Sequence, residues 1–208
     1  MYFLVAAFSL GLYAAADGAV SPNCTPQAKD QVAWEMVRAM AQDVFYLFAT
    51  TISQTPNCTS FKVNQTDEGN HTGTLVIRSG GEKVTTTTVV ADGNKFIINT
   101  EDGAYPVLYT DNSTCGVFAS EDPDELLLWV AGGSAQEHTF DQCCWKVFEG
   151  EVKKKRDSEQ GCEEPEVLPT GRPAKQTGTY SKFSENCLTF VNESRSEELP
   201  SSETESSS

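Results

Sequence analysis

The sequence predicts a mainly β protein: an eight-stranded antiparallel barrel with an N-terminal helix and a C-terminal helix packed outside. Three observations support this prediction. Short segments rich in aromatic and β-branched residues fill the middle of the chain, turn residues separate them roughly every eleven residues, and amphipathic segments flank the series. A β-sandwich gives the same local signals, so this pattern leaves the choice between sandwich and barrel open.

Residues 1–16 are predicted to be a secretory signal peptide. They carry no charge, and the small residues Ala14, Ala15 and Ala16 offer a cleavage site. The apolar run is too short for a membrane anchor, and no later stretch reaches the ~18 apolar residues that a spanning helix needs. We therefore expect a secreted, extracellular and monomeric protein with no membrane span, in which residues 17–192 form a single domain.

The first element of the mature chain is a predicted helix over residues 27–44, because its apolar residues from Val37 to Val44 recur with the spacing of one buried helical face. Eight strands follow and predict a barrel over about residues 44–131. Gly and Asn between them supply the positive φ of tight turns, with Gly132-Gly133 as the last turn. The predicted strands are 44–53, 60–66, 72–79, 83–91, 94–100, 104–110, 115–120 and 126–131.

A second helix is predicted over residues 139–152, with Phe140, Cys144 and Phe148 on one side. The basic run 153–156 then suits the negative end of the helix dipole, with a heparin-binding patch as the alternative interpretation. Residues 157–178 are polar and contain three prolines, so we expect a loop, followed by an extended segment over 180–191. Residues 193–208 are Ser and Glu and predict a disordered acidic tail.

The composition argues against nucleic-acid binding and against catalysis. A formal net charge of −15 would repel phosphates. The chain contains no nucleophile elbow, no zinc-protease motif and no phosphate-cradling glycine loop. His138 with Asp141 nearby could form an acid–base pair, but a surface histidine at a helix entrance explains it better. We expect no enzyme activity, no metal and no cofactor.

The mature chain holds seven cysteines, an odd number, so one thiol is left over if the others form disulfides. The adjacent Cys143 and Cys144 point in different directions and are expected to reach two different partners; a redox-active pair is the less favoured interpretation. Six N-x-S/T sequons predict a glycoprotein. They begin at Asn23, Asn57, Asn64, Asn70, Asn112 and Asn192.

A binding pocket is predicted from the alternation of large apolar residues along the strands. Alternate residues of a barrel strand face inward, so one parity of these residues would line a mostly apolar pocket. Which parity faces inward is not decided by the sequence. The candidate lining residues are Phe96, Ile98, Tyr109, Phe118, Leu127 and Trp129.

Over residues 32–152 the chain resembles the tick salivary lipocalins, the family that includes the tick histamine-binding proteins. The resemblance is carried by AWEMVRAMAQDVFYLFATT, NKFIINTEDG, CGVF, LLLWV and CCWKVF in this order, with Cys115 and Cys144 lying 29 positions apart. It implies a lipocalin barrel with a helix outside. It also implies sequestration of a small host inflammatory or immune mediator, in the service of immune evasion.

The resemblance further implies the disulfide pairs Cys115–Cys144 and Cys24–Cys143. Cys58 is then expected to pair with a cysteine near the C-terminus. The usual family distance favours Cys162, whereas apolar surroundings favour Cys187. We predict Cys58–Cys162.

The same resemblance bears on the ligand. Amine binders of the family place an acid two residues before the strand tryptophan, where this chain has Leu127, and Thr51 replaces another amine-contacting residue. Because a buried ammonium needs a carboxylate, we expect a hydrophobic ligand first, an eicosanoid, a fatty acid or a sterol. Arg78 could meet a fatty-acid carboxylate, unless it faces outward. A biogenic amine (histamine or serotonin) is the second candidate, and binding of a host immune protein or cell surface is the third.

Overall fold

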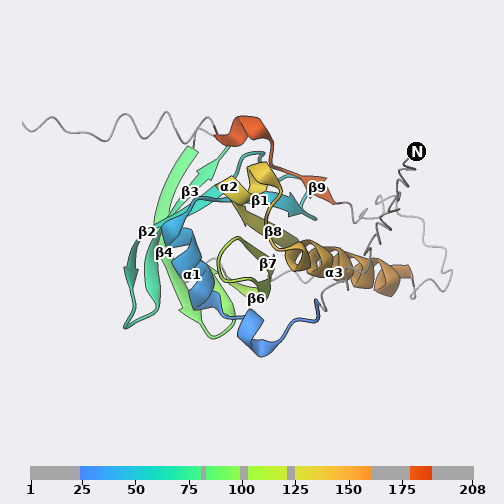
Figure 1. The fold of residues 1–208 in the computed structure, drawn as a ribbon, viewed down its shortest axis with the longest axis horizontal. Coiled ribbons are helices and arrows are strands. Elements are labelled where there is room, and N and C mark those ends of the chain that lie inside the picture. The colour runs from blue at the N-terminus through green and yellow to red at the C-terminus, as the bar shows by residue number, and fades with distance from the viewer. Residues whose placement is uncertain (1–23, 81–82, 99–102, 121–124, 161–178, 189–208) are drawn as a thin grey trace, which may run out of the picture.

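The computed structural model describes residues 24–80, 83–98, 103–120, 125–160 and 179–188 (Figure 1). The predicted signal peptide, the acidic tail, Cys162, and the sequons at Asn23 and Asn192 lie outside these residues. None of the helices in the described ranges is both long and apolar enough to cross a membrane.

Eight antiparallel strands form a closed barrel, which confirms the predicted fold and rules out the sandwich. Each strand pairs with the next, β8 pairs with β1, and β1 pairs with β2 to close the ring. The strands match the predicted segments to within a few residues. They are β1 (Phe45–Thr50), β2 (Ser60–Asp67), β3 (Thr72–Ser79), β4 (Lys83–Asp92), β5 (Lys95–Ile98), β6 (Ala104–Thr110), β7 (Cys115–Ala119) and β8 (Leu126–Ala131).

Strand β8 shows why part of the barrel is apolar on both faces. Leu127 and Trp129 point into the barrel core, while Leu128 and Val130 point outward. These outward residues pack under the helix α3 (Gln142–Gln160), in one apolar cluster with Val147 of that helix. A strand that is covered on both sides reads as a continuous apolar run, which explains LLLWV.

Helix α1 (Ala33–Gln42) lies across one end of the barrel and closes it (Figure 1). Met36, Val37 and Met40 are fully buried in the core formed by the inward residues of the strands. The helix is shorter than the predicted 27–44, because a separate 3-10 turn, η1 (Ala28–Asp30), precedes it and the backbone at Asp43 is extended. The end of the barrel that carries α1 is called the closed end below.

The Gly132-Gly133 pair was predicted as a turn, and this prediction is wrong. The two glycines begin a short helix, α2 (Gly132–Glu137). A Cβ atom at Gly132 would lie 2.9 Å from the ring of Tyr46, so the close approach of the helix to β1 requires glycine there.

Helix α3 is longer than the predicted 139–152 and begins at Gln142. Residues 157–160 were predicted as loop but are helical, because Asp157, Ser158, Glu159 and Gln160 include no proline or glycine that would end the helix. The last turns of α3 extend beyond the barrel (Figure 1), where a polar sequence can remain helical without a buried face.

The C-terminal segment was predicted to be extended over 180–191, and the structure keeps only a short strand of this. Strand β9 (Tyr180–Ser181) pairs with Ala49 and Thr50 of β1, and a 3-10 turn, η2 (Glu185–Leu188), follows it. On the edge that faces away from β8, β1 therefore pairs with β2 at its first residues and with β9 at its last residues.

Three disulfides join the described elements. Cys24–Cys143 and Cys115–Cys144 agree with the predicted pairs. Cys58 pairs with Cys187, so the prediction of Cys58–Cys162 is wrong. The reason is the path of the C-terminal segment: the backbone N–H of Cys58 donates to the carbonyl of Lys182 at 3.0 Å, which brings the buried Cys187 alongside.

Candidate ligand-binding site

The barrel encloses a cavity of about 480 Å³. This volume lies in the range of roughly 300–1,000 Å³ that is typical of small-molecule sites. The cavity extends from the side chain of Met40 on α1 to the end of the barrel opposite the closed end, which is called the mouth below. It is lined by Met40, Leu47, Ile52, Thr55, Thr59, Phe61, Ile77, Phe96, Ile98, Tyr105, Phe118, Ser120, Glu125, Leu127 and Trp129.

Four aromatic rings make up much of the inner wall. The ring centroids of Phe61 and Trp129 lie 4.0 Å apart with the planes at 20°, a stacked pair. Phe96 stacks beyond Phe61 at 6.5 Å and meets Phe118 edge-on at 5.6 Å. Such contacts hold the rings in fixed positions, so they present a preformed apolar surface to a ligand.

The polar lining residues lie at the mouth, in and beside the connections between strands. Thr55 and Thr59 come from the connection before β2, and Ser120 and Glu125 flank the connection between β7 and β8. Among the described lining residues, Glu125 is the only one with a charged side chain. The cavity is therefore apolar in its depth and polar, with one carboxylate, at its entrance.

Five of the residues predicted to contact the ligand line this cavity. They come from β5, β7 and β8, where the inward parity follows a regular alternation. These five residues are Phe96, Ile98, Phe118, Leu127 and Trp129. Their contact with a ligand remains a prediction.

Tyr109 was predicted to face the pocket, but the structure places it outside. A bulge between Val107 and Tyr109 shifts the register of β6 against β7, so the alternation changes face. The hydroxyl of Tyr109 donates a 2.8 Å hydrogen bond to Asp141 beside α3. Burial and this carboxylate raise the pKa of Tyr109 well above its ordinary value. Asp141 is thus engaged by Tyr109, and His138 is exposed against the edge of Phe48.

Thr51 and Arg78 are also not among the residues that line the cavity. Thr51 supports the sheet instead: its hydroxyl accepts a hydrogen bond from the backbone N–H of Leu126 at 2.8 Å. Arg78 follows Ile77, which lines the cavity, so alternation puts Arg78 on the outer face of β3. There it lies near Tyr46, whose pKa is raised to about 12 by burial and by Asp43 despite the opposing charge of Arg78.

Ten lining residues were not predicted from the sequence: Met40, Leu47, Ile52, Thr55, Thr59, Phe61, Ile77, Tyr105, Ser120 and Glu125. Phe61 and Ile77 show the same alternation as the residues that were found, and they face each other across β2 and β3, so the signal was present. No sequence signal places Met40 or Glu125, because α1 and the β7–β8 connection reach the cavity only through the tertiary arrangement.

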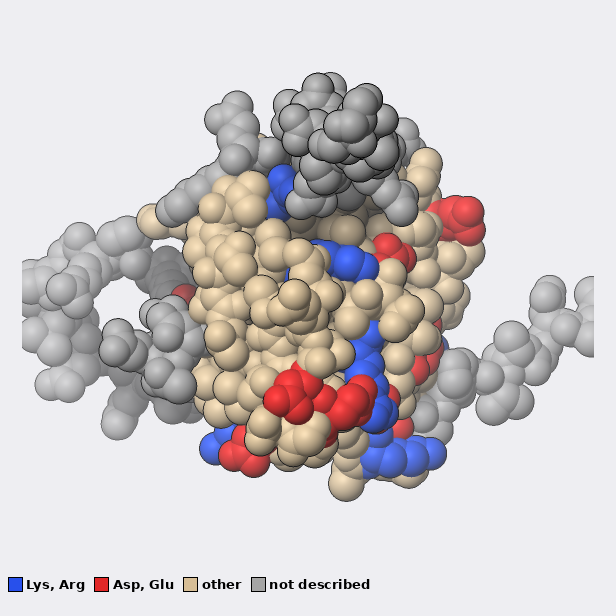
Figure 2. Space-filling view, turned by 90° about the vertical axis from the view of Figure 1, so that its left-hand side faces the viewer, with Lys and Arg blue, Asp and Glu red and all other residues tan. Residues whose placement is uncertain are grey.

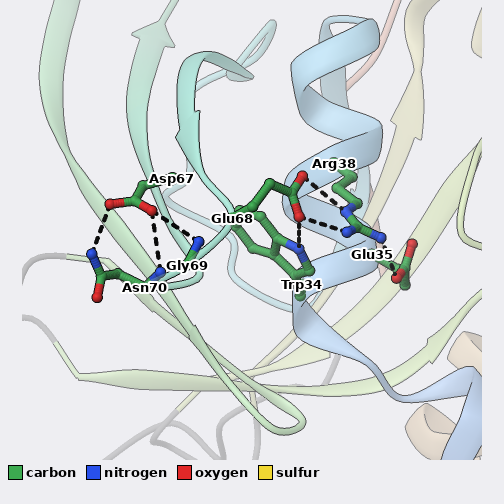
Figure 3. A network of polar contacts seen from close by, with 7 residues as sticks. All are labelled: Trp34, Glu35, Arg38, Asp67, Glu68, Gly69 and Asn70. Carbon is green, nitrogen blue, oxygen red and sulfur yellow. Dashed lines mark hydrogen bonds and ion pairs between the residues drawn. The ribbon is translucent and has the colours of Figure 1, made fainter.

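A polar network outside the cavity ties α1 to the β2–β3 hairpin at the closed end (Figure 3). Glu68 accepts a 3.0 Å hydrogen bond from the indole N–H of the buried Trp34 and two bonds from Arg38, at 2.6 and 3.3 Å. Hydrogen bonds from Arg38, and then from Trp34, lower the pKa of Glu68.

Figure 2 views the molecule from the left-hand side of Figure 1, where uncharged residues cover most of the surface.

Metal binding finds no support in the described ranges, where no group of three or more His, Cys, Asp or Glu side chains is placed to hold an ion. The arrangement offers a preformed cavity for non-covalent binding.

Comparisons with known proteins identify the fold. No family model matches the chain, and no curated protein matches its sequence. A solved structure described as "Crystal Structure of AM182 Serotonin Complex" is similar with a TM-score of 0.53 and 18% identity, over 75% of this chain and 92% of that one. The siderocalin Ex-FABP gives a TM-score of 0.39 and 10% identity, over 56% of this chain and 83% of that one. The closed eight-stranded antiparallel barrel with helices outside is the lipocalin fold.

Proposed function

We propose that this protein is a secreted lipocalin that sequesters a small hydrophobic mediator in its barrel without transforming it. The single observation that carries the proposal is the preformed cavity of about 480 Å³ with its wall of stacked aromatic rings. Burying apolar ligand surface against such a wall contributes about 25 cal/mol per Å², so a ligand that fills the cavity can bind tightly without any charged contact.

The resemblance to the tick salivary lipocalins supports a role outside the cell, in which the protein binds a host inflammatory or immune mediator. The favoured hydrophobic ligands are eicosanoids, fatty acids and sterols. A scavenger acts by mass action and needs an affinity near the concentration of its target, in the nanomolar range, or about −12 kcal/mol. The three disulfides fit an oxidising, extracellular environment.

A biogenic amine is the second candidate, and Glu125 is the observation that favours it. A carboxylate that lines the mouth of the cavity can pair with a protonated amine. The similar structure described as a serotonin complex gives the same suggestion. Against it, Leu127 occupies the position of the acid that amine binders of the resembled family use, and the inner wall offers no second carboxylate among its described residues.

Native mass spectrometry of the secreted protein, followed by calorimetry with histamine, serotonin, a leukotriene and cholesterol, tests the proposal. We expect a retained apolar molecule and submicromolar binding of at least one apolar ligand. A matched pair of variants locates the binding: Ile98→Trp fills the cavity, whereas Ile97→Trp places the same ring on the outer face of β5. Loss of binding in both variants, or in neither, would count against a site inside the barrel.

A further inference from the structure

We propose that the cavity selects its ligand by head group: it accepts amphiphiles whose polar end donates a hydrogen bond, a hydroxyl or a protonated amine, and it rejects carboxylates. This inference rests on the proposed function and narrows it. Sterol-like and amino-alcohol lipids fit this chemistry, whereas fatty acids and eicosanoids, which end in a carboxylate, do not.

The first step is the orientation of the ligand. The depth of the cavity is formed by Met40, Leu47 and the stacked pair of Phe61 and Trp129, which offer no charged group. Thr55, Ser120 and Glu125 line the mouth. An amphiphile therefore enters with its apolar end first and leaves its head group beside these polar side chains, because burying an unpaired head against the aromatic wall costs several kcal/mol.

The second step is the sign of the charge at the mouth. Glu125 is the only charged residue among the described lining residues. The cations on neighbouring segments are directed elsewhere: Lys62 donates to the carbonyl of Ala41 at 3.1 Å, and Lys182 donates to the carbonyl of Ser53 at 3.1 Å. Arg78 lies on the outer face of β3. No cation in the described part of the chain lines the cavity to meet a ligand carboxylate.

The third step is that Glu125 stands on a fixed backbone. Its carbonyl accepts a 2.9 Å hydrogen bond from the N–H of Ser120, and the N–H of the next residue, Leu126, donates to Thr51. These bonds fix the backbone of Glu125 immediately before β8, so its side chain starts at the entrance of the cavity that it lines. A donor head gains a charge-assisted hydrogen bond there, and a second carboxylate meets repulsion in a partly desolvated site.

The test uses three ligands with the same chain and different heads: decanol, decylamine and decanoate, titrated below their aggregation limits by calorimetry at neutral pH. We expect the wild-type protein to bind decanol and decylamine at least about tenfold more tightly than decanoate. In Glu125→Gln the difference between decanol and decanoate should fall to within about threefold. Glu149→Gln removes the same charge from the exposed side of α3 and should keep the wild-type preference.

Each outcome distinguishes this inference from the proposed function. Equal binding of the three ligands, or tighter binding of decanoate, would overturn head-group selection while leaving sequestration intact. A preference that survives Glu125→Gln would also overturn it, because another group would then be responsible. If none of the three ligands binds, and the panel of mediators fails as well, the proposed function itself is wrong.

Discussion

The two ends of the barrel are built from the same alternating strands and yet differ in what fills them. At the closed end, Met36 and Val37 of α1 pack among inward residues such as Phe45 and Leu75, all of them fully buried. At the mouth, inward residues such as Leu127 face an open cavity. At either end, an eight-stranded barrel has room for the buried face of one helix or for one small ligand. The position of α1 therefore decides which end is packed with side chains and which end can hold a ligand.

The ends also differ in how they are held together. Side-chain hydrogen bonds among Trp34, Arg38 and Glu68 connect α1 to the β2–β3 hairpin at the closed end (Figure 3). Toward the mouth, the Cys58–Cys187 disulfide and the short strand β9 secure the edge of β1. The closed end is therefore expected to contribute most of the stability, and the mouth to set the binding properties.

Truncating one leucine at each end gives the largest expected contrast. Leu75→Ala, at a fully buried position of the closed end, should lower the free energy of unfolding by about 3–5 kcal/mol, because it leaves a cavity in packed core. Leu127→Ala should cost only about 1–2 kcal/mol, since one side of Leu127 already faces open space. Urea unfolding followed by circular dichroism measures both, and equal costs would contradict the contrast.

The next largest expected effect is the loss of one disulfide, either beside the mouth or between β7 and α3. Replacing both cysteines of Cys58–Cys187 or of Cys115–Cys144 by Ala should cost about 2–4 kcal/mol. The loss should be larger for the former, whose bridge spans 129 residues against 29. Only the loss of Cys58–Cys187 should also weaken ligand binding, because this bridge secures the edge of β1 next to the mouth. Cys115–Cys144 ties β7 to α3 outside the barrel.

Both double variants carry Cys162→Ala, so that no spare thiol can replace the missing partner. The Cys162→Ala protein is the reference for unfolding and for binding. If loss of Cys115–Cys144 weakens binding as much as loss of Cys58–Cys187, the division of roles between the two regions is wrong.

Tyr109→Phe tests whether an aromatic residue outside the cavity influences binding. It removes the hydrogen bond from Tyr109 to Asp141 and should lower the free energy of unfolding by about 1–2 kcal/mol, as expected for a bond to a carboxylate. Ligand affinity should stay within about twofold of the wild type, because the ring packs toward α3 rather than into the cavity. Tyr105→Phe, at a residue that lines the cavity, is the matched comparison.

The smallest expected effect concerns the pH dependence of the closed end. Because Arg38 and Trp34 lower the pKa of Glu68 in the folded state, the carboxylate stabilises the fold above its ordinary pKa. That contribution is lost as the pH falls through the lowered value. Thermal unfolding between pH 6 and pH 3 should show a shallower acid-side decline in Tm for Glu68→Gln than for the wild type. Glu149→Gln, on exposed α3, should leave the slope unchanged.

Local pattern predicted the strands well because each is short and bounded by turn residues. Turns at Gly80, Gly93 and Gly103 adopt the positive φ that the sequence indicated. The pattern failed where long-range contacts override it. Gly132 begins a helix packed against β1, where Tyr46 leaves no room for a side chain, and the bulge in β6 moves Tyr109 to the outer face.

The candidate site divides in the same way. Five residues of β5, β7 and β8 were found from alternation, since a strand fixes the parity of its own side chains. Met40 and Glu125 were missed, because their approach to the cavity depends on how α1 and the β7–β8 connection are placed. Cys187 was the alternative partner of Cys58 on the strength of its apolar surroundings, and the path of β9 along β1 is what brings it near.

The sequence by itself determined the number and order of the eight barrel strands, the two flanking helices and the apolar character of the barrel interior. These follow from residue periodicity and turn chemistry, which act over a few neighbouring residues. Only the tertiary structure decided that α1 closes one end, that Cys58 joins Cys187, and that Glu125 is the charge at the mouth. Those features depend on contacts between segments far apart in the chain, and such contacts are set by the closure of the whole barrel.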